Sequence, residues 1–270
     1  MQNILLLFAR FGTHITFLFF TVLSFLLIVN FNKTQRSIFI NSSNFYANKL
    51  DARTSKWQNY LSLQEVNDSL ARHNAELMER FINIRTNEAV ISDSTLQYEL
   101  IPAKVIRNTY NLRNNHLTLD IGAKHGVAKD MGVLSEKGIL GIVRNVSADF
   151  SHVISILNSQ ARISCTVKPY AYPGNLIWKD MDPNFVTLES IPKHVDIEIG
   201  DTVITNGYST IFPPNVEVGT IADIKSDRGS SNFNLKVALF NNVPNAKRAY
   251  VIKNNLSTQQ RQLENFEDEQ

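Results

Sequence analysis

An apolar run close to the N-terminus constrains this chain more than any other feature. No charged residue lies between Arg10 and Lys33, and the segment 11–32 is rich in Phe and Leu. About 20 apolar residues is the length that a helix needs to cross the hydrocarbon core of a bilayer. A helix also satisfies its own backbone hydrogen bonds in that environment. We therefore predict a transmembrane anchor at 11–32, preceded by a short cytoplasmic tail at 1–10.

A cleaved signal peptide is the alternative interpretation of this run. Signal peptides have an apolar region of about 7–15 residues, followed by a cleavage site made of small residues. Here the run is longer and continues with Asn-Phe-Asn-Lys-Thr-Gln-Arg, which favours the anchor. Its orientation stays open, because flanking Lys and Arg would keep the rest of the chain in the cytoplasm, whereas a long following domain can cross the membrane regardless of charge.

The chain as a whole has the composition of a globular protein. Of the 270 residues, 43% are hydrophobic and 19% are charged, and the formal net charge is +2. No dense basic stripe is present, which argues against nucleic acid as a partner. Cys165 is the only cysteine, so an intrachain disulfide and a zinc site built from cysteines are both excluded.

Residues 46–92 contain neither proline nor glycine, and their side chains repeat every seven residues. The two ladders are Leu63, Leu70, Leu77 and Ile84 at the d positions, and Tyr60, Asn67, Asn74 and Phe81 at the a positions. This pattern predicts a coiled coil through which two copies form a homodimer, with higher-order assembly left open. The alternative is an amphipathic helix that packs on its own domain, because several a positions are polar.

After Ser92, short β-branched runs are separated by Gly, Asn, Asp and Pro. The runs are 103–110, 116–121, 132–134, 138–146, 152–157, 162–167, 175–178, 185–189, 202–206, 216–224, 233–239 and 248–252. Such runs predict small antiparallel barrels or sandwiches. We expect a mainly β fold after the two helices, with β domains at 96–168 and 174–253, and a disordered, Gln- and Glu-rich tail at 254–270.

Two stretches of the β region resemble the signature of a known family. Residues 122–143 read GAKHGVAKDMGVLSEKGILGIV, and residues 200–221 read GDTVITNGYSTIFPPNVEVGTI. They are similar to the glycine-rich motifs of the rod shape-determining MreC family, whose second motif reads Gly-Asp-x-Val-x-Thr-Ser-Gly and then Phe-Pro-x-Gly-x-x-Val-Gly. Asn206 and Asn215 stand where that motif has Ser and Gly. Because Asn tolerates the left-handed backbone better than most residues, we expect the turn at Asn215 to survive.

The resemblance implies a single-pass scaffold of the bacterial inner membrane, with its β domains in the periplasm, that organises cell-wall elongation and maintains cell shape. The partners that it implies are MreD, the actin-like MreB, an elongation transpeptidase and a RodA-type glycosyltransferase. The alternative function is a periplasmic adaptor of an efflux or secretion pump. Such adaptors need two helical arms, and this sequence shows one.

The sequence contains no convincing active site. Cys165 lies in an alternating, strand-like run where a small buried side chain is expected, and the six histidines lack the i, i+4 spacing of a helical zinc site. Two small barrels also occur in chymotrypsin-like proteases, but no Gly-Asp-Ser-Gly stretch is present. His125, between two turn glycines, is expected to be a solvated loop residue. We predict a non-enzyme without catalytic residues, cofactor or metal.

The segment Phe212, Pro213, Pro214 is the one further candidate for binding. Two consecutive prolines favour an extended, stiff backbone that presents the aromatic ring. The ring either contacts a partner protein or plugs the end of its own barrel, and the sequence does not decide between these two roles.

Overall fold

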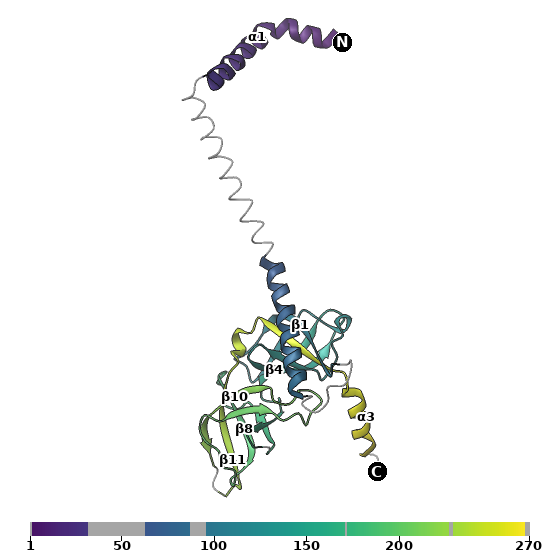
Figure 1. Cartoon of the computed structure of the whole chain (residues 1–270), viewed down its shortest axis with the longest axis vertical. Helices are drawn as coiled ribbons and strands as arrows, with labels where there is room; N and C mark the ends of the chain where they lie inside the picture. The colour runs from purple at the N-terminus through teal and green to yellow at the C-terminus, as the bar shows by residue number, and fades with distance from the viewer. Residues whose placement is uncertain (1, 32–62, 87–95, 171, 227–228, 268–270) are drawn as a thin grey trace. The chain divides into compact units, whose positions relative to one another are not determined.

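The computed structural model (Figure 1) describes residues 2–31, 63–86, 96–170, 172–226 and 229–267. The chain divides into two units, Met1–Asp68 and Ser69–Gln270. The described part of the predicted coiled coil is a helix at 63–86, and the rest of that prediction, including Tyr60, lies outside the described residues.

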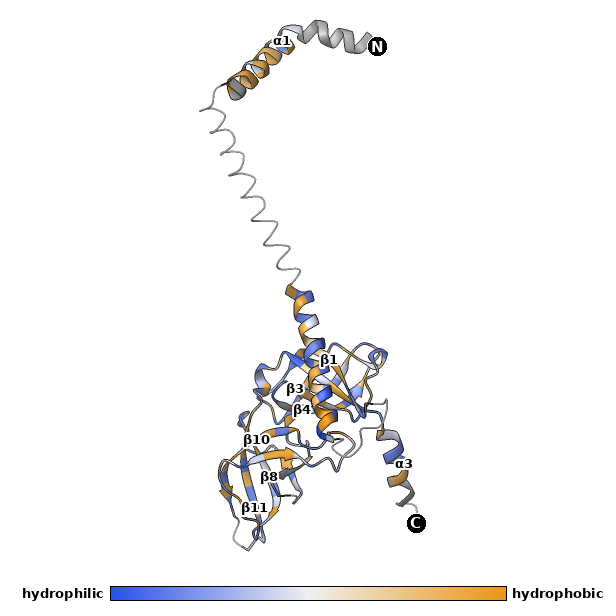
Figure 2. Cartoon of the chain, viewed as in Figure 1, coloured by the Kyte–Doolittle hydropathy of each residue, from blue (hydrophilic) through white to orange (hydrophobic). Residues whose placement is uncertain are grey.

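The first unit contains helix α1, Gln2–Phe31, which spans the apolar run. Figure 2 shows the apolar residues along it, and their side chains are exposed, Phe17 at 74% and Phe20 at 65%. The hydroxyl of Thr21 donates to the carbonyl oxygen of Phe17 at 2.8 Å, so this polar side chain is satisfied within the helix. Among the residues that the structure describes, no helix combines the length and the apolar character that crossing a membrane requires.

The second unit contains, within its described residues, two closed antiparallel barrels of six strands each. In order around the first barrel, the strands are β1 (Tyr98–Asn108), β12 (Arg248–Asn254), β3 (Gly132–Ser135), β4 (Gly138–Val146), β5 (Ser151–Asn158) and β2 (Asn114–Leu119). A 3-10 turn, η1 (Ala123–His125), lies between β2 and β3. Side chains such as Leu140 and Tyr250, both 0% exposed, belong to the buried core.

The second barrel is continuous in sequence. In order around it, the strands are β10 (Glu217–Lys225), β11 (Asn232–Leu239), β8 (Phe185–Pro192), β7 (Gly174–Ile177), β6 (Ile163–Val167) and β9 (Thr202–Thr205). The turn η2 (Val243–Asn245) follows β11 and leads to β12. The mainly β fold class is therefore confirmed.

The predicted division into domains at 96–168 and 174–253 differs from the observed strand pairing. Strand β6 belongs to the second barrel, where Cys165 pairs with Thr205 of β9. Strand β12 returns to the first barrel, where Lys104 pairs with Arg248. The pattern of apolar residues locates strands, but it does not show which distant strand closes a barrel.

The tail predicted to be disordered, 254–270, contains a helix in this structure. Helix α3 occupies Ser257–Glu267. Just before it, the backbone N–H of Asn255 donates to the carbonyl oxygen of Gln97 at 2.9 Å, and Asn255 Nδ2 donates to the carbonyl oxygen of Leu96 at 2.9 Å. Gln, Arg, Leu and Glu are strong helix formers, so this segment is helical although its composition is that of a disordered tail.

Candidate interaction surfaces

The helix at 63–86 has two apolar faces. One face packs on the first barrel, where Ala71, Ala75 and Ile82 are at most 9% exposed. The other face is uncovered, and in the second unit it consists of Leu70 (56% exposed), Leu77 (52%), Phe81 (55%) and Ile84 (70%). At 3.6 residues per turn, this stripe lies roughly 140° around the helix from the buried face. A single helix with two such faces has one of them available for a second partner.

The uncovered stripe contains the predicted d ladder. Leu63, in the first unit, is 63% exposed, and Asn67 is exposed as well. Asn74 differs, because it is half-buried and its Nδ2 donates to Oε1 of Glu136 at 3.4 Å. The amide of Asn74 is therefore engaged with the β3–β4 turn of its own chain. One face of the helix packs on its own barrel, as the alternative interpretation of the heptads predicts. The leucine face is exposed, and self-association through it stays a prediction.

Polar side chains of the helix fix it to the edge of β1. Strand β1 pairs with β12 over its first half and with β2 only over its second half, so the first half has an unpaired edge. Asn83 covers that edge: its Nδ2 donates to the carbonyl oxygen of Tyr98 at 2.8 Å, and its Oδ1 accepts from the Tyr98 N–H at 3.0 Å. One turn earlier, Oε2 of Glu79 accepts from the N–H of Leu100 at 3.1 Å. The helix thus replaces a neighbouring strand and protects the edge.

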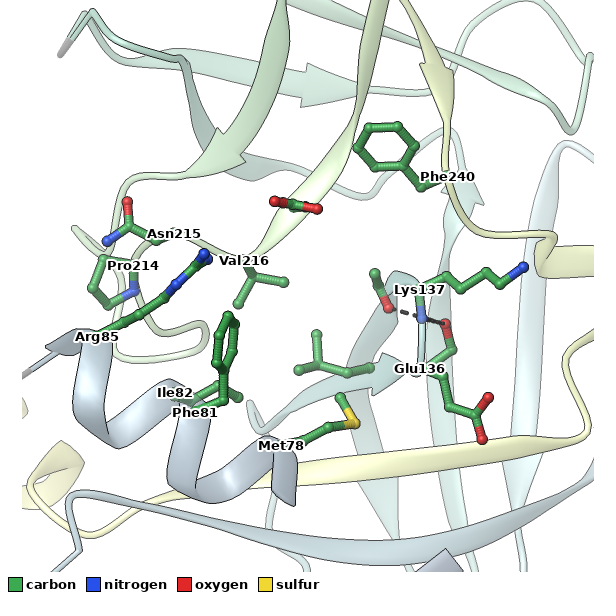
Figure 3. Close-up of a pocket in the computed structure, with 14 residues that line it drawn as sticks. Met78, Phe81, Ile82, Arg85, Glu136, Lys137, Pro214, Asn215, Val216 and Phe240 are labelled. Atoms are coloured by element: carbon green, nitrogen blue, oxygen red, sulfur yellow. Dashed lines mark hydrogen bonds between the residues drawn. The ribbon is translucent and has the colours of Figure 1, made fainter. Parts of the chain in front are cut away.

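A cavity of about 570 Å³ lies where this helix meets both barrels (Figure 3). Its lining residues are Met78, Phe81, Ile82, Arg85, Leu134, Ser135, Glu136, Lys137, Gly138, Pro214, Asn215, Val216, Glu217 and Phe240. Figure 3 shows Phe81 on the helix and Phe240 across the opening. The site contains two cationic and two carboxylate side chains, so it carries no net formal charge.

The Phe212 segment does not form an exposed partner loop. Phe212 is 4% exposed and belongs to the core. Its ring lies against Gly132 of the first barrel, where a Cβ would come within 2.8 Å of Cε1. Pro213 is buried, and its carbonyl oxygen accepts from the Thr205 hydroxyl at 2.6 Å. The ring is therefore structural, and only Pro214 of the three predicted residues reaches the cavity.

Neither of the two candidate catalytic residues is placed for chemistry. Cys165 is 0% exposed, and burial raises the pKa of its thiol far above the usual range, which disfavours the nucleophilic thiolate. His125 is exposed, and its Nδ1 accepts from the N–H of Gly122 at 3.2 Å, as expected for a loop residue. Within the described ranges, no group of three or more His, Cys, Asp or Glu side chains is arranged to hold a metal ion.

The two barrels are what known proteins share with this chain. The family described as "Rod shape-determining protein MreC, barrel core" matches residues 105–253, which is more than half of the sequence. The chain belongs to the MreC family. It is 29% identical over 142 residues to the cell shape-determining protein MreC of Listeria monocytogenes, covering 51% of this chain and 48% of that protein. It is 26% identical over 149 residues to that of Escherichia coli, covering 54% and 39%.

Solved structures of MreC proteins have the same fold. The Listeria monocytogenes MreC structure gives a TM-score of 0.56 at 23% identity, covering 71% of this chain and 94% of that one. The crystal structure of MreC from Pseudomonas aeruginosa gives a TM-score of 0.53 at 18% identity, covering 57% and 98%. The matches span less than half of the Listeria and Escherichia proteins' own length.

Three features of this MreC-family chain were not predicted from its sequence. Two of them, the hydrogen bonds from Asn83 to the edge of β1 and the cavity beside Phe81, depend on contacts between distant segments. The third feature is a pair of histidines on adjacent strands, His116 and His152, whose ring centroids lie 4.6 Å apart. Burial, and secondarily the neighbouring His152, lowers the pKa of His116. Period-2 alternation could have placed both rings on one face, but it could not have paired β2 with β5.

Proposed function

We propose that this chain is a non-enzymatic, membrane-anchored scaffold that organises the cell-wall elongation machinery and maintains cell shape. The observation that carries the proposal is the match of the MreC barrel core over residues 105–253. The matched relatives are described as cell shape-determining proteins. Depletion of the protein in its source bacterium should make cells lose their shape, and unchanged morphology after complete depletion would contradict the proposal.

The anchor and the topology are part of this proposal. The uncharged run at 11–32 supports a single pass through the bacterial inner membrane, with residues 1–10 in the cytoplasm and the barrels in the periplasm. An alkaline phosphatase fusion after residue 270 should be active, and the same enzyme fused before residue 1 should be inactive. The reverse pattern would place the barrels in the cytoplasm.

The proposed partners are the cell-wall elongation proteins: MreD, the actin-like MreB, an elongation transpeptidase and a RodA-type glycosyltransferase. Membership of the MreC family supports this set. Full-length protein captured from detergent-solubilised membranes should retain the transpeptidase. If none of the four copurifies, even after cross-linking in intact cells, the scaffold proposal loses its support.

Self-association through the helix at 63–86 is the last part of the proposed function. An uncovered apolar stripe that repeats every seven residues supports a coiled coil between two copies. Leu77→Glu places a charge in that stripe and should make the full-length protein monomeric. Arg72→Glu is the matched control, because Arg72 is exposed on the same helix outside the stripe. If the Leu77→Glu variant still forms dimers, the stripe is not the dimer interface.

A further inference from the structure

The outer face of the first barrel carries a row of polar side chains that crosses four adjacent strands. Arg107 of β1 pairs with Thr118 of β2, and Thr118 pairs in turn with His152 of β5. His152 pairs with Asn145 of β4. Residues that pair directly across antiparallel strands lie on the same face of the sheet, with Cβ atoms about 4.5–5.5 Å apart. These four side chains therefore form one continuous row.

A β-bulge at each end of the row changes which residues stand there. In β4 the register shifts between Val143 and Asn145, so Arg144 is an additional residue opposite His152. A second shift lies in β1, just before Arg107. Bulges re-aim side chains and are over-represented beside functional sites. Both arginines are exposed, and three strand spacings place their backbones roughly 14 Å apart, one at each end of the row.

The centre of the row is a pair of imidazoles. The ring centroids of His116 and His152 lie 4.6 Å apart, and the Nδ1 atom of each ring is buried without a hydrogen-bond partner among the described residues. Nε2 is therefore the nitrogen that each ring can offer to a ligand. Burial, and secondarily the neighbouring His152, lowers the pKa of His116. A bound anion offsets the repulsion between two protonated rings, so anion binding and proton uptake favour each other.

The distribution of charge between the two barrels favours an anion on the first. Residues 98–161 and 240–256, which form the first barrel and its loops, contain ten Lys or Arg and five Asp or Glu. Residues 162–239, which form the second, contain seven Lys or Arg and nine Asp or Glu. An excess of one sign of charge attracts ligands of the opposite sign.

The local charges also exclude a metal cation as the ligand of the histidine pair. The charged residues on the elements around it are Lys104, Arg107, Asp120, Arg144 and Asp149. Oδ1 of Asp120 accepts from the N–H of Lys104 at 2.7 Å, and Asp149 forms an ion pair with Lys124 at 2.8 Å. Within the described part of the chain, neither Arg107 nor Arg144 pairs with a carboxylate. Two arginines without acidic partners repel a cation and attract an anion.

We propose that this row binds a chain of linked phosphate groups, with Arg107 and Arg144 at its ends and the histidine pair at its middle. The planar guanidinium group presents paired N–H donors that fit phosphate oxygens. The hydroxyl of Thr118 adds a further donor between them. Because the arginines stand far apart, several linked phosphates reach both ends, whereas a single phosphate does not. Neither the apolar run nor the helix at 63–86 takes part in this site.

The test measures binding of sodium tripolyphosphate to full-length protein in maltoside micelles by isothermal titration calorimetry. Arg107→Gln and Arg144→Gln should each weaken binding about fivefold or more, because each removes charge-assisted hydrogen bonds. Arg113→Gln is the matched control: Arg113 is exposed just before β2, outside the row, and its variant should bind like the native chain. A circular dichroism melt checks that every variant is folded.

A second measurement tests the histidine pair. The ratio of the affinities at pH 6.0 and pH 7.5 should be larger for the native chain than for His116→Gln, because the variant lacks one titrating ring. Titration of the ligand itself affects both proteins equally and cancels in this comparison. Equal ratios would show that the histidines do not take part.

Three outcomes of the calorimetry overturn the proposal. The first is an absence of binding by the native chain at both pH values. The second is an equal loss of affinity in Arg113→Gln and in the two row variants, which would mean that the whole basic barrel attracts the anion without a site. The third is displacement of tripolyphosphate by phosphatidylglycerol added to the micelles, which would assign the row to lipid headgroups instead.

Discussion

The two barrels have the same arrangement of strands but are closed differently. Going around each barrel, β12, β1, β2, β5, β4 and β3 of the first correspond to β6, β7, β8, β11, β10 and β9 of the second. Gly141 of β4 and Gly219 of β10 occupy equivalent places, and at both a Cβ would lie 2.0 Å from a backbone oxygen of the adjacent strand. The second barrel uses six consecutive strands, whereas the first takes β12 from beyond the second barrel.

This difference in closure affects how easily each barrel is disrupted. The second barrel closes through local connections. The first closes only after the chain has passed through the whole second barrel, and it needs the helix at 63–86 to cover the edge of β1. Long-range closure makes a unit slow to fold and dependent on distant segments. We therefore expect the first barrel to be the more easily broken of the two.

The largest effect should follow truncation before Arg248, which removes β12. Tyr250, Val251 and Ile252 are at most 1% exposed, and loss of one such side chain costs about 2–5 kcal/mol. Their combined loss approaches the total stability of about 5–15 kcal/mol of a typical domain. Hydrogen exchange should show unprotected amides in β1–β5 and protected amides in β6–β11. Protection retained in β1–β5 would mean that the first barrel closes without β12.

The next effect tests how far the barrels are independent. Phe212 precedes β10 of the second barrel, but its ring lies on Gly132 of the first. Phe212→Ala should cost about 3–5 kcal/mol, as truncation of other buried aromatics does. Because the ring contacts both barrels, urea titrations should show a lower free energy of unfolding for each of them. A loss confined to the second barrel, seen by hydrogen exchange, would show that the barrels are independent here.

A smaller effect should come from removing the hydrogen bonds by which Asn83 covers the edge of β1. Asn83→Ala leaves the N–H and the carbonyl oxygen of Tyr98 without partners, and each unsatisfied buried group costs about 1–3 kcal/mol. Amide exchange should accelerate at 98–100 and stay unchanged in the second barrel. Arg72→Ala, an exposed change on the same helix, is the control. Equal exchange rates at 98–100 in both variants would show that the helix does not secure this edge.

The sequence predicted the strands well and their partners poorly. Each of the twelve predicted runs overlaps one observed strand, and 138–146 coincides with β4. Alternation and turn residues are local signals, so they locate such runs. The pairing of Lys104 with Arg248 is a property of the closed barrel and leaves no local mark. Likewise, the heptads revealed the uncovered leucine face, but small residues such as Ala71 and Ala75 gave no sign of the face that packs on the barrel.

The smallest predicted effect is a pH dependence confined to the first barrel. Nδ1 of His116 and Nδ1 of His152 are buried and have no hydrogen-bond partner within the described part of the chain. The pKa of His116 is lowered, first by burial and then by His152. The unfolded chain, with a histidine pKa of about 6.5, therefore binds more protons than the folded chain near that pH. Stability is then fully present above about pH 6.5 and decreases as the pH falls.

Substitutions in the two barrels test the origin of this dependence. The urea midpoint of the native chain should decrease between pH 7.5 and pH 5.5, and His116→Gln should flatten that decrease because it removes the titrating ring. His194→Gln is the control, since His194 lies in the second barrel with its ring 5.2 Å from that of Tyr172. That variant should keep the native pH dependence. If His116→Gln shows the full native decrease, the histidine pair is not its source, and acid sensitivity does not distinguish the two barrels.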